Sequence, residues 1–198
     1  MLCPARNDED GPGADVGPQA PRWLRQRGIR SETIVTTFGY AYRQLTCAEV
    51  PLLKDLLRVF GEAFDEVDTY LRSAPSDDYL TRLLSKQHFI AVVAMKGEEV
   101  VGGLAAYELD KFEQDRREIY IYDLAVAQSH RRRGVATGMI RELKRIASKR
   151  DVYIIFVQAD LWDGPAITLY ESLGTKKTAH HFDIEVHAAI PRRRGTGR

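Results

Sequence analysis

Seven residues in the second half of the chain have the composition of an anion-binding turn. The segment Arg131–Thr137 (RRRGVAT) follows an apolar stretch and places Gly134 just before an amphipathic stretch. A glycine at a strand-to-helix turn lets the backbone approach a ligand closely. The first N–H groups of a helix, at the positive end of its dipole, bind phosphate groups. We therefore expect a diphosphate at this turn; the alternative is an ordinary basic turn on a solvated surface.

Two better-known phosphate loops do not match this segment. No Gly-Lys-Ser/Thr follows Gly134, as a Walker loop requires. The second early glycine of the dinucleotide-binding fingerprint is also missing. The expected ligand is therefore neither a nucleoside triphosphate in a Walker loop nor a dinucleotide in a Rossmann fold.

A second candidate is a carboxylate inside an apolar stretch. Asp123 interrupts the run Ile119–Val126, and a charged group in such a run is costly unless it is paired or wet. We expect Asp123 to face a cleft, where it accepts a proton from an attacking ammonium or anchors it. The alternative is a structural carboxylate that bonds a neighbouring turn, because perturbed carboxylates are not always functional.

A third candidate is a phenol on a short helix. Pro165 and Gly174 mark the start and end of that helix, and Tyr170 lies on its second turn. A phenol at hydrogen-bond distance can donate a proton to a leaving group. The alternative is an ordinary packing tyrosine.

The charges are distributed unevenly along a chain whose net charge is +1. Residues 61–78 carry six carboxylates and one base, whereas residues 130–150 carry eight Lys or Arg residues and one acid. Such a chain can hold a cationic ligand at one region and an anionic ligand at the other, although charge runs are commonly solvated helix faces. The expected contacts of a cationic ligand are Asp65, Glu66, Tyr70, Asp78, Glu113, Asp123, Asp160, His181 and Asp183.

Bulk properties limit the remaining function classes. The 198 residues suit one domain. The two cysteines, Cys3 and Cys47, predict no disulfide framework and indicate a reducing compartment. No signal peptide or membrane span is apparent, so we expect a cytoplasmic protein without membrane contact. The five histidines show no metal-ligand spacing, and the Arg/Gly tail lacks the aromatic residues of specific nucleic-acid binding.

The hydrophobic pattern predicts a folded unit over residues 36–186, between a disordered extension (1–35) and a flexible Arg/Gly tail (187–198). The predicted strands are 38–45, 89–95, 100–109, 119–126, 152–159 and 182–186. The predicted helices are 50–64, 77–84, 135–147 and 165–173. This order predicts an α/β (α+β) fold with a mixed, mostly antiparallel central sheet and helices on both faces.

The spacing Arg-x-x-Gly-x-Ala in Arg131–Ala136, together with this element order, resembles the GNAT N-acetyltransferases. The resemblance covers residues 36–186 and implies acetyl-CoA as cosubstrate, with no metal. It implies that Tyr170 lies near the CoA sulfur, and that the backbone after Asp123 binds the pantetheine arm and polarises the thioester carbonyl. The implied cofactor contacts are Leu124, Ala125, Val126, Arg131, Arg132, Arg133, Gly134, Val135, Ala136, Thr137, Ala166 and Tyr170.

A closer resemblance rests on ten short strings. The chain is similar to the type I aminoglycoside 3-N-acetyltransferases in FGEAF (60–64), DTY (68–70), SDDYL (76–80), FIAVVA (89–94), VVGGLAAY (100–107), KFEQ (111–114), REIYIYDLAV (117–126), HRRRGVAT (130–137), VQAD (157–160) and HFDI (181–184). This resemblance implies direct acetyl transfer, in a ternary complex, to the 3-amino group of the deoxystreptamine ring in gentamicin-like antibiotics. The drug loses a positive charge and is inactivated. We expect a homodimer.

Two other functions remain open. One keeps the GNAT fold but takes a linear polyamine or a protein amine as acceptor. The other is a sensor that binds acetyl-CoA without turnover, with Asp123 and Tyr170 dispensable. Turnover of spermidine without turnover of gentamicin favours the first alternative.

Overall fold

The computed structural model describes residues 35–37 and 39–186. The chain divides after Gln158 into two compact units, which are described separately below. The predicted extension lies almost entirely, and the predicted Arg/Gly tail entirely, outside the described residues. The two domain limits therefore stay predictions.

A single six-stranded sheet organises the first unit, with strands in the order β1-β2-β3-β4-β5-β6. The strands are β1 (Val35–Thr37), β2 (Tyr40–Gln44), β3 (Phe89–Lys96), β4 (Glu99–Asp110), β5 (Arg117–Val126) and β6 (Val152–Val157). Neighbouring strands pair antiparallel from β1 to β5, and only β5 and β6 run parallel. A parallel pair needs a crossover connection, and helix α4 (Val135–Ser148) provides it.

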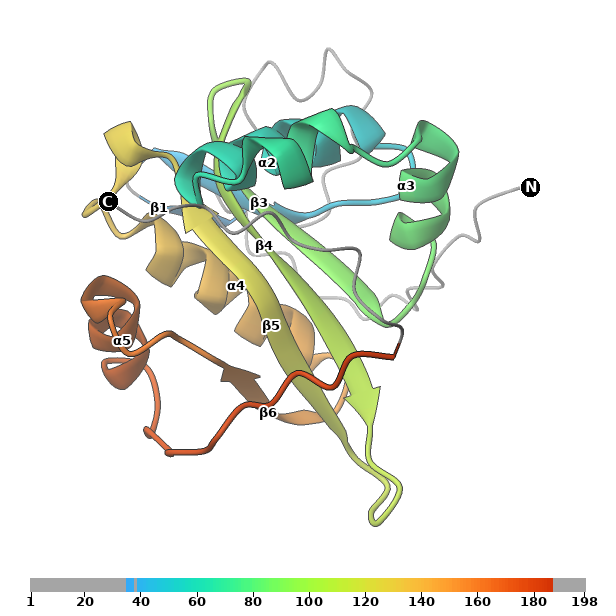
Figure 1. Ribbon diagram of the computed structural model, residues 1–198, viewed down its shortest axis with the longest axis vertical. Helices are drawn as coiled ribbons and strands as arrows, with labels where there is room; N and C mark the ends of the chain where they lie inside the picture. Colours follow the sequence, from blue (N-terminus) through green and yellow to red (C-terminus); the bar gives the residue numbers. More distant parts are fainter. Residues whose placement is uncertain (1–34, 38, 187–198) are drawn as a thin grey trace, which may run out of the picture. The chain divides into compact units, whose positions relative to one another are not determined.

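Helices cover both faces of the sheet (Figure 1). Helix α2 (Val50–Ala63) lies on one face, where Leu56 meets the backbone at Gly103 so closely that a side chain at Gly103 would overlap it. Helix α4 lies on the other face, where Gly138 leaves room for the ring of Tyr42. The predicted mixed, mostly antiparallel sheet with helices on both faces is confirmed.

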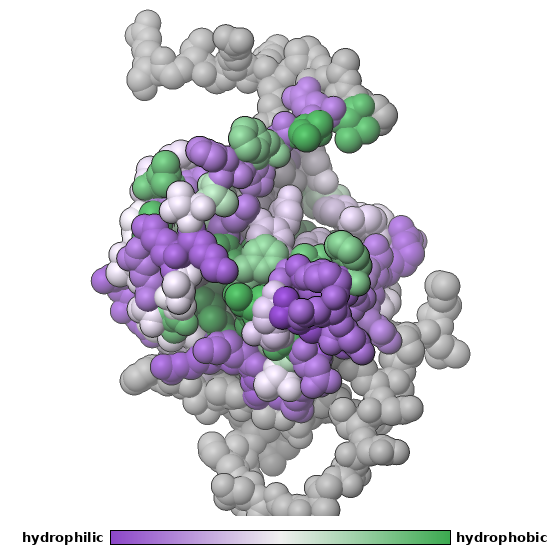
Figure 2. Space-filling view, turned by 90° about the horizontal axis from the view of Figure 1, so that it is seen from below, coloured by the Kyte–Doolittle hydropathy of each residue, from purple (hydrophilic) through white to green (hydrophobic). Residues whose placement is uncertain are grey.

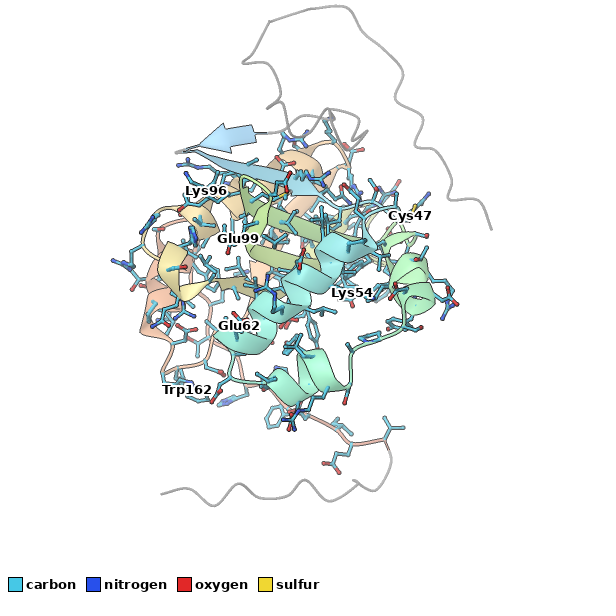
Figure 3. All side chains as sticks on the ribbon, turned by 90° about the horizontal axis from the view of Figure 1, so that it is seen from above. Cys47, Lys54, Glu62, Lys96, Glu99 and Trp162 are labelled. Carbon is cyan, nitrogen blue, oxygen red and sulfur yellow. The ribbon has the colours of Figure 1, made fainter. Side chains whose placement is uncertain are left out.

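Most predicted elements occur within one or two residues of their expected bounds. Helix α3 (Asp77–Leu84) has the predicted limits, and the side chain of Ser76 caps it by accepting a hydrogen bond from the N–H of Tyr79. Lys54 of α2 forms an ion pair with Asp77 at the start of α3, on the side seen in Figure 3. A short π-helical segment, η1 (Asp68–Arg72), connects α2 to α3.

Three expectations differ from the structure. Residues 182–186 form no strand, and their large side chains are exposed, with Phe182, Ile184 and Val186 all more than three quarters accessible. Alternation of apolar and polar residues favours a strand, but a strand also needs a partner with free backbone groups. The predicted first strand (38–45) begins only at Tyr40, as β2, and an unpredicted strand, β1, precedes it, because Gly39 at φ +75° makes a tight turn between β1 and β2. Cys47 is disulfide-bonded, which departs from the expectation of unpaired cysteines.

A bulge in β5 decides which side chains face α2. Ala105 pairs with Asp123 but Ala106 pairs with Ile121, so Tyr122 is an additional residue in β5. Residues opposite each other on antiparallel strands share a face, and a bulge changes the alternation of side chains. Asp123 therefore lies on the α2 face of the sheet, whereas Ile121 lies on the α4 face. Without the bulge both would lie on the same face.

The second unit contains helix α5 (Gly164–Glu171), whose side-chain cap is Asp163. It starts one residue before Pro165 and ends two residues before the predicted limit. Two large apolar side chains of this unit, Leu161 and Trp162, are exposed. Figure 2 shows one face of the molecule, on which apolar residues lie among hydrophilic ones. Within the described part of the chain, no helix has the length and apolar character needed to cross a bilayer.

Candidate active site

The turn before α4 has the backbone geometry of an anion-binding loop. Gly134 adopts φ +75°, and its carbonyl accepts the first helical hydrogen bond, from the N–H of Gly138, at 2.9 Å. The N–H groups of Val135, Ala136 and Thr137, at the start of the helix, have no intrahelical acceptor. No side chain caps the helix in their place. A Cβ added at Gly134 would have no heavy atom from outside the turn within 4 Å. This open space beside uncapped N–H groups fits the diphosphate predicted there.

The side chains of the turn differ in exposure and in their contacts with the rest of the protein. Arg131 is tied to the protein, because its Nε donates to the carbonyl oxygen of Val126 at 3.0 Å. Arg132 adopts φ +61° and is exposed. Val135 is 2% exposed and packs in the core, so only its backbone can meet a ligand. The exposed residues Arg132 and Arg133 are left as the cationic side chains of the loop.

A basic cavity of about 420 Å³ adjoins the loop, lined by Tyr40, Lys96, Arg133 and Gly134. Lys96, labelled in Figure 3, lies 4.9 Å from the centre of the Tyr40 ring. The Tyr40 hydroxyl is 3.0 Å from Nδ1 of His130. The cavity extends the positive surface of the loop toward β2 and β3. Sequence reasoning did not identify Tyr40 or Lys96, because both are far from the loop along the chain.

The C-terminal half of β5 has one open edge. Strand β6 pairs with Arg117–Ile121 only, so among the described strands nothing pairs with Tyr122–Val126 on that side. The N–H of Ala127 donates to Val101 of β4, and by alternation the backbone groups of Leu124 and Val126 point away from β4. The carbonyl of Val126 is used by Arg131. The backbone of Leu124 is therefore the best placed to bind an extended ligand arm, which is the role predicted for Leu124–Val126.

Asp123 lies on the α2 face and is only partly accessible to solvent. The Tyr70 hydroxyl of η1 donates to its Oδ1 at 3.3 Å. Burial raises the pKa of the Asp123 carboxyl above its ordinary value, the hydrogen bond from Tyr70 lowers it, and the negative charge of Glu66 raises it. A carboxylate with a raised pKa is a stronger base than one in water, and this suits the proton-accepting role predicted for it.

Aromatic rings surround this carboxylate on two sides. The Tyr70 ring packs against those of Phe60 and Phe64, with both centroids 5.8 Å away, and the two phenylalanine rings also contact each other at 5.6 Å. On the sheet, Tyr122 lies edge-on to Tyr107 at 6.0 Å and to Tyr120 at 5.9 Å. Tyr122 is 65% exposed and immediately precedes Asp123 in the bulge. Sequence reasoning missed every ring here except Tyr70; the bulge that gathers them has no signal in a single sequence.

The remaining predicted carboxylates of the first unit fall into two groups. Asp65, Glu66 and Asp78 are exposed, and among the described residues no Lys or Arg pairs with them. They are available to a cation. Glu113 is placed elsewhere, in the β4–β5 connection, where it pairs with Lys111 at 3.2 Å and Arg116 at 3.9 Å. Six residues of β5, about 20 Å of extended chain, separate that end of the strand from Asp123.

The other predicted contacts belong to the second unit. Burial, with a smaller contribution from the charge of Asp163, raises the pKa of Tyr170 to about 12, so the phenol keeps its proton at neutral pH. The N–H of Ala166 is already used by the Asp163 cap at 3.0 Å. His181 pairs with Asp183 at 3.1 Å, and the carbonyl of Asp160 accepts a hydrogen bond from the N–H of Asp163.

Metal ligation has no candidate in the part of the chain that the structure describes. Within it, no three His, Cys, Asp or Glu side chains gather closely enough to hold an ion. The polar groups that the site does present are hydrogen-bond donors (backbone N–H groups, arginines and phenols) and one accepting carboxylate. These are groups for binding an organic anion and moving a proton.

The fold and the loop define an acetyltransferase of the GNAT class. Residues 53–175 match the model of the acetyltransferase (GNAT) family, and the chain belongs to that family. GNAT acetyltransferases use acetyl-CoA as acetyl donor. The GNAT fold predicted from the element order is confirmed.

Solved structures and curated relatives give the particular neighbours. The aminoglycoside acetyltransferase HMB0005 from an uncultured soil metagenomic sample is 52% identical, with a TM-score of 0.74 over 75% of this chain and 99% of that one. The aminoglycoside acetyltransferase meta-AAC0020, also from an uncultured soil metagenomic sample and solved with sisomicin, is 26% identical, with a TM-score of 0.71 over 75% and 97%. A probable N-acetyltransferase family 8 member 5 of Mus musculus is 28% identical over 78% of this chain and 67% of its own length. N-acetyltransferase 8B of Rattus norvegicus is 29% identical over 46% of this chain, which spans 40% of that relative.

Proposed function

We propose that this protein transfers the acetyl group of acetyl-CoA to the 3-amino group of 2-deoxystreptamine aminoglycosides of the gentamicin type. The single observation that carries the proposal is Asp123, a partly buried carboxylate at a bulge, beside the open edge of β5. The 52% identity to the aminoglycoside acetyltransferase HMB0005 supports the choice of acceptor. So does the structure of meta-AAC0020 with sisomicin.

The surroundings of Asp123 suit a polycationic acceptor with saturated rings. The charge of Glu66 acts on Asp123, and the carboxylates of Asp65 and Asp78 are exposed elsewhere on the first unit; these three, without cationic partners among the described residues, attract ammonium groups. The exposed ring of Tyr122 beside Asp123 offers an apolar surface to a sugar or cyclitol ring. A small monoamine uses neither feature.

The chain's own residues supply binding and proton transfer. Bound acetyl-CoA supplies an electrophilic thioester carbonyl and a thiolate leaving group. Arg132, Arg133 and the N–H groups at the start of α4 bind its diphosphate, and the backbone of Leu124 binds the extended arm. Asp123 accepts a proton from the acceptor nitrogen as that nitrogen forms its bond to the acetyl carbon. Tyr170, whose role rests on the resemblance to the GNAT N-acetyltransferases, donates a proton to the departing sulfur.

A direct ternary-complex transfer follows from this assignment, because no residue is given a covalent role. The product carries one positive charge fewer than the acceptor. Loss of that charge and of a strong hydrogen-bond donor weakens binding to polyanionic RNA. We therefore propose that acetylation inactivates the antibiotic, and we also propose that the protein acts in the cytoplasm as a homodimer.

A thiol-release assay with an amine panel tests the acceptor. The panel is gentamicin, sisomicin, spermidine, a lysine peptide and a monoamine, with NMR of the product to locate the acetyl group. We expect turnover of the aminoglycosides with acetylation at the 3-amino group. Their KM should rise with salt, because attraction between exposed charges is screened over about 10 Å at 0.1 M.

The second candidate is a polyamine or protein-amine acetyltransferase. The similarity to the N-acetyltransferase 8 proteins favours this alternative. Turnover of spermidine or the peptide without turnover of gentamicin would establish it. Binding of acetyl-CoA without turnover of any amine would instead establish a sensor.

A further inference from the structure

We infer that Tyr70 is a positioning residue that holds the carboxylate of Asp123 through one oxygen and leaves the other oxygen for the acceptor amine. This inference deepens the proposed function and rests on it. It assigns Tyr70 a task different from the direct contact with the acceptor expected from the sequence.

The first step is the hydrogen bond itself. The Tyr70 hydroxyl donates to Oδ1 of Asp123 at 3.3 Å, and it is the one side-chain donor to this carboxylate among the described residues. A phenol that donates to one oxygen fixes the rotation of the carboxyl group. It leaves Oδ2 as the oxygen available to accept a proton.

The second step is that Tyr70 is itself held in place. Its ring packs against Phe60 of α2 and Phe64, the residue that follows α2, at 5.8 Å from each centroid, and these two rings also contact each other at 5.6 Å. A Cβ added at Gly61 would lie 3.3 Å from the Cβ of Tyr70, so the glycine lets η1 approach α2 closely. Rigid support of this kind keeps a catalytic group within the narrow limits that proton transfer needs.

The third step concerns the charged and titratable groups around Asp123. They are Tyr70 from η1, Glu66 before it, Tyr107 from β4, and Tyr120 and Tyr122 from β5 itself. Tyr70 and Glu66 act on the Asp123 carboxyl with opposite signs. The hydrogen bond from Tyr70 favours the ionised form and lowers the pKa, whereas the charge of Glu66 favours the protonated form and raises it.

The opposite signs provide the test. Carboxyl ¹³C NMR follows the titration of Asp123 in the ligand-free wild type and in the variants Tyr70→Phe and Glu66→Gln. Tyr79→Phe is the matched control, because Tyr79 is an exposed tyrosine of α3. We expect the Asp123 midpoint to move to higher pH in Tyr70→Phe, to lower pH in Glu66→Gln, and to stay in place in Tyr79→Phe.

Kinetics of the same variants complete the test. In Tyr70→Phe the kcat for gentamicin should fall about tenfold to hundredfold, with an unchanged KM for acetyl-CoA, and the acidic limb of kcat/KM should move to higher pH. A wild-type kcat together with an unmoved Asp123 midpoint overturns the inference while acetyl transfer still stands. If the wild type acetylates no amine, the proposed function fails, and the inference about a catalytic position falls with it even if the NMR midpoints move as expected.

Discussion

The two halves of the candidate site are built in different ways. The main part of the donor side, from Leu124 to Thr137, is one continuous segment, in which Arg132 at φ +61° and Gly134 at φ +75° turn the chain into the helix that follows. The acceptor side joins Tyr70, Tyr107 and Asp123, which are far apart in the chain, at a bulge in β5. A local motif can be identified from its own residues. A site assembled over long distances depends on register, and a change of one residue in register reverses the face on which a side chain lies.

This contrast predicts separate effects for substitutions on the two sides. The largest belongs to Asp123→Asn, which keeps size and polarity but removes the base. Turnover of gentamicin should fall by about 10² to 10⁴ while the calorimetric affinity for acetyl-CoA stays unchanged. If turnover survives at neutral pH, Asp123 is a bystander, and the base must be sought in Asp160, Asp183 or a bound water.

The same variant should keep or gain thermal stability although it loses activity. The folded pKa of Asp123 is raised, so the ionised carboxylate costs stability, and that cost appears as pH rises through the unfolded and then the folded pKa. Asp123→Asn should therefore unfold at the same or a higher temperature than the wild type at pH 7. A lower melting temperature would indicate that the carboxylate is structural.

The next effect in size is that of Tyr170→Phe, which removes only the phenolic oxygen. If Tyr170 protonates the leaving thiolate, kcat should fall by roughly 10² or somewhat less. The loss should be smaller with an activated thioester whose thiol leaves readily, and stopped-flow thiol release measures both. An unchanged kcat would return Tyr170 to a packing role.

Gly134→Val tests the donor side. A β-branched residue at φ +75° is strained by about 1 to 2 kcal/mol, and its side chain would occupy the open space in front of the helix N–H groups. We expect the affinity for acetyl-CoA to weaken about tenfold to hundredfold in a folded protein. Gly97→Val is the control, since Gly97 has φ +60° and an equally open Cβ position in the β3–β4 turn. Equal affinity in the two variants would remove the loop from the binding site.

Gly61→Ala should give the smallest effect and is the most specific probe of the acceptor side. Alanine favours the interior of α2 by about 1 kcal/mol, yet its Cβ would press on Tyr70 at 3.3 Å. We expect stability to hold or rise while gentamicin turnover falls several-fold, because small misplacements at a reacting centre are costly. Thermal melts and steady-state kinetics on one preparation check both. An unchanged kcat would show that the position of Tyr70 is not critical.

The fold was largely predictable because its elements carry local signals. Ser76 as a cap, Pro165 near a helix start and the apolar period of α4 placed these elements within one or two residues. Residues 182–186 have the alternation of a strand but form none, since pairing is not a local property. Asp123 was identified by its charge in an apolar run. The hydrogen bond from Tyr70 to Asp123 and the position of the Tyr122 ring beside it could not be predicted, because both depend on the β5 bulge.

The central claim of this account is that the loop at Gly134 binds the donor and the carboxylate at Asp123 serves the acceptor. Calorimetric titration of acetyl-CoA into Asp123→Asn and Gly134→Val, side by side with the wild type, tests it most directly. The account predicts wild-type affinity in Asp123→Asn and an affinity weakened about tenfold to hundredfold in Gly134→Val. Equal losses of acetyl-CoA affinity in both variants would contradict it.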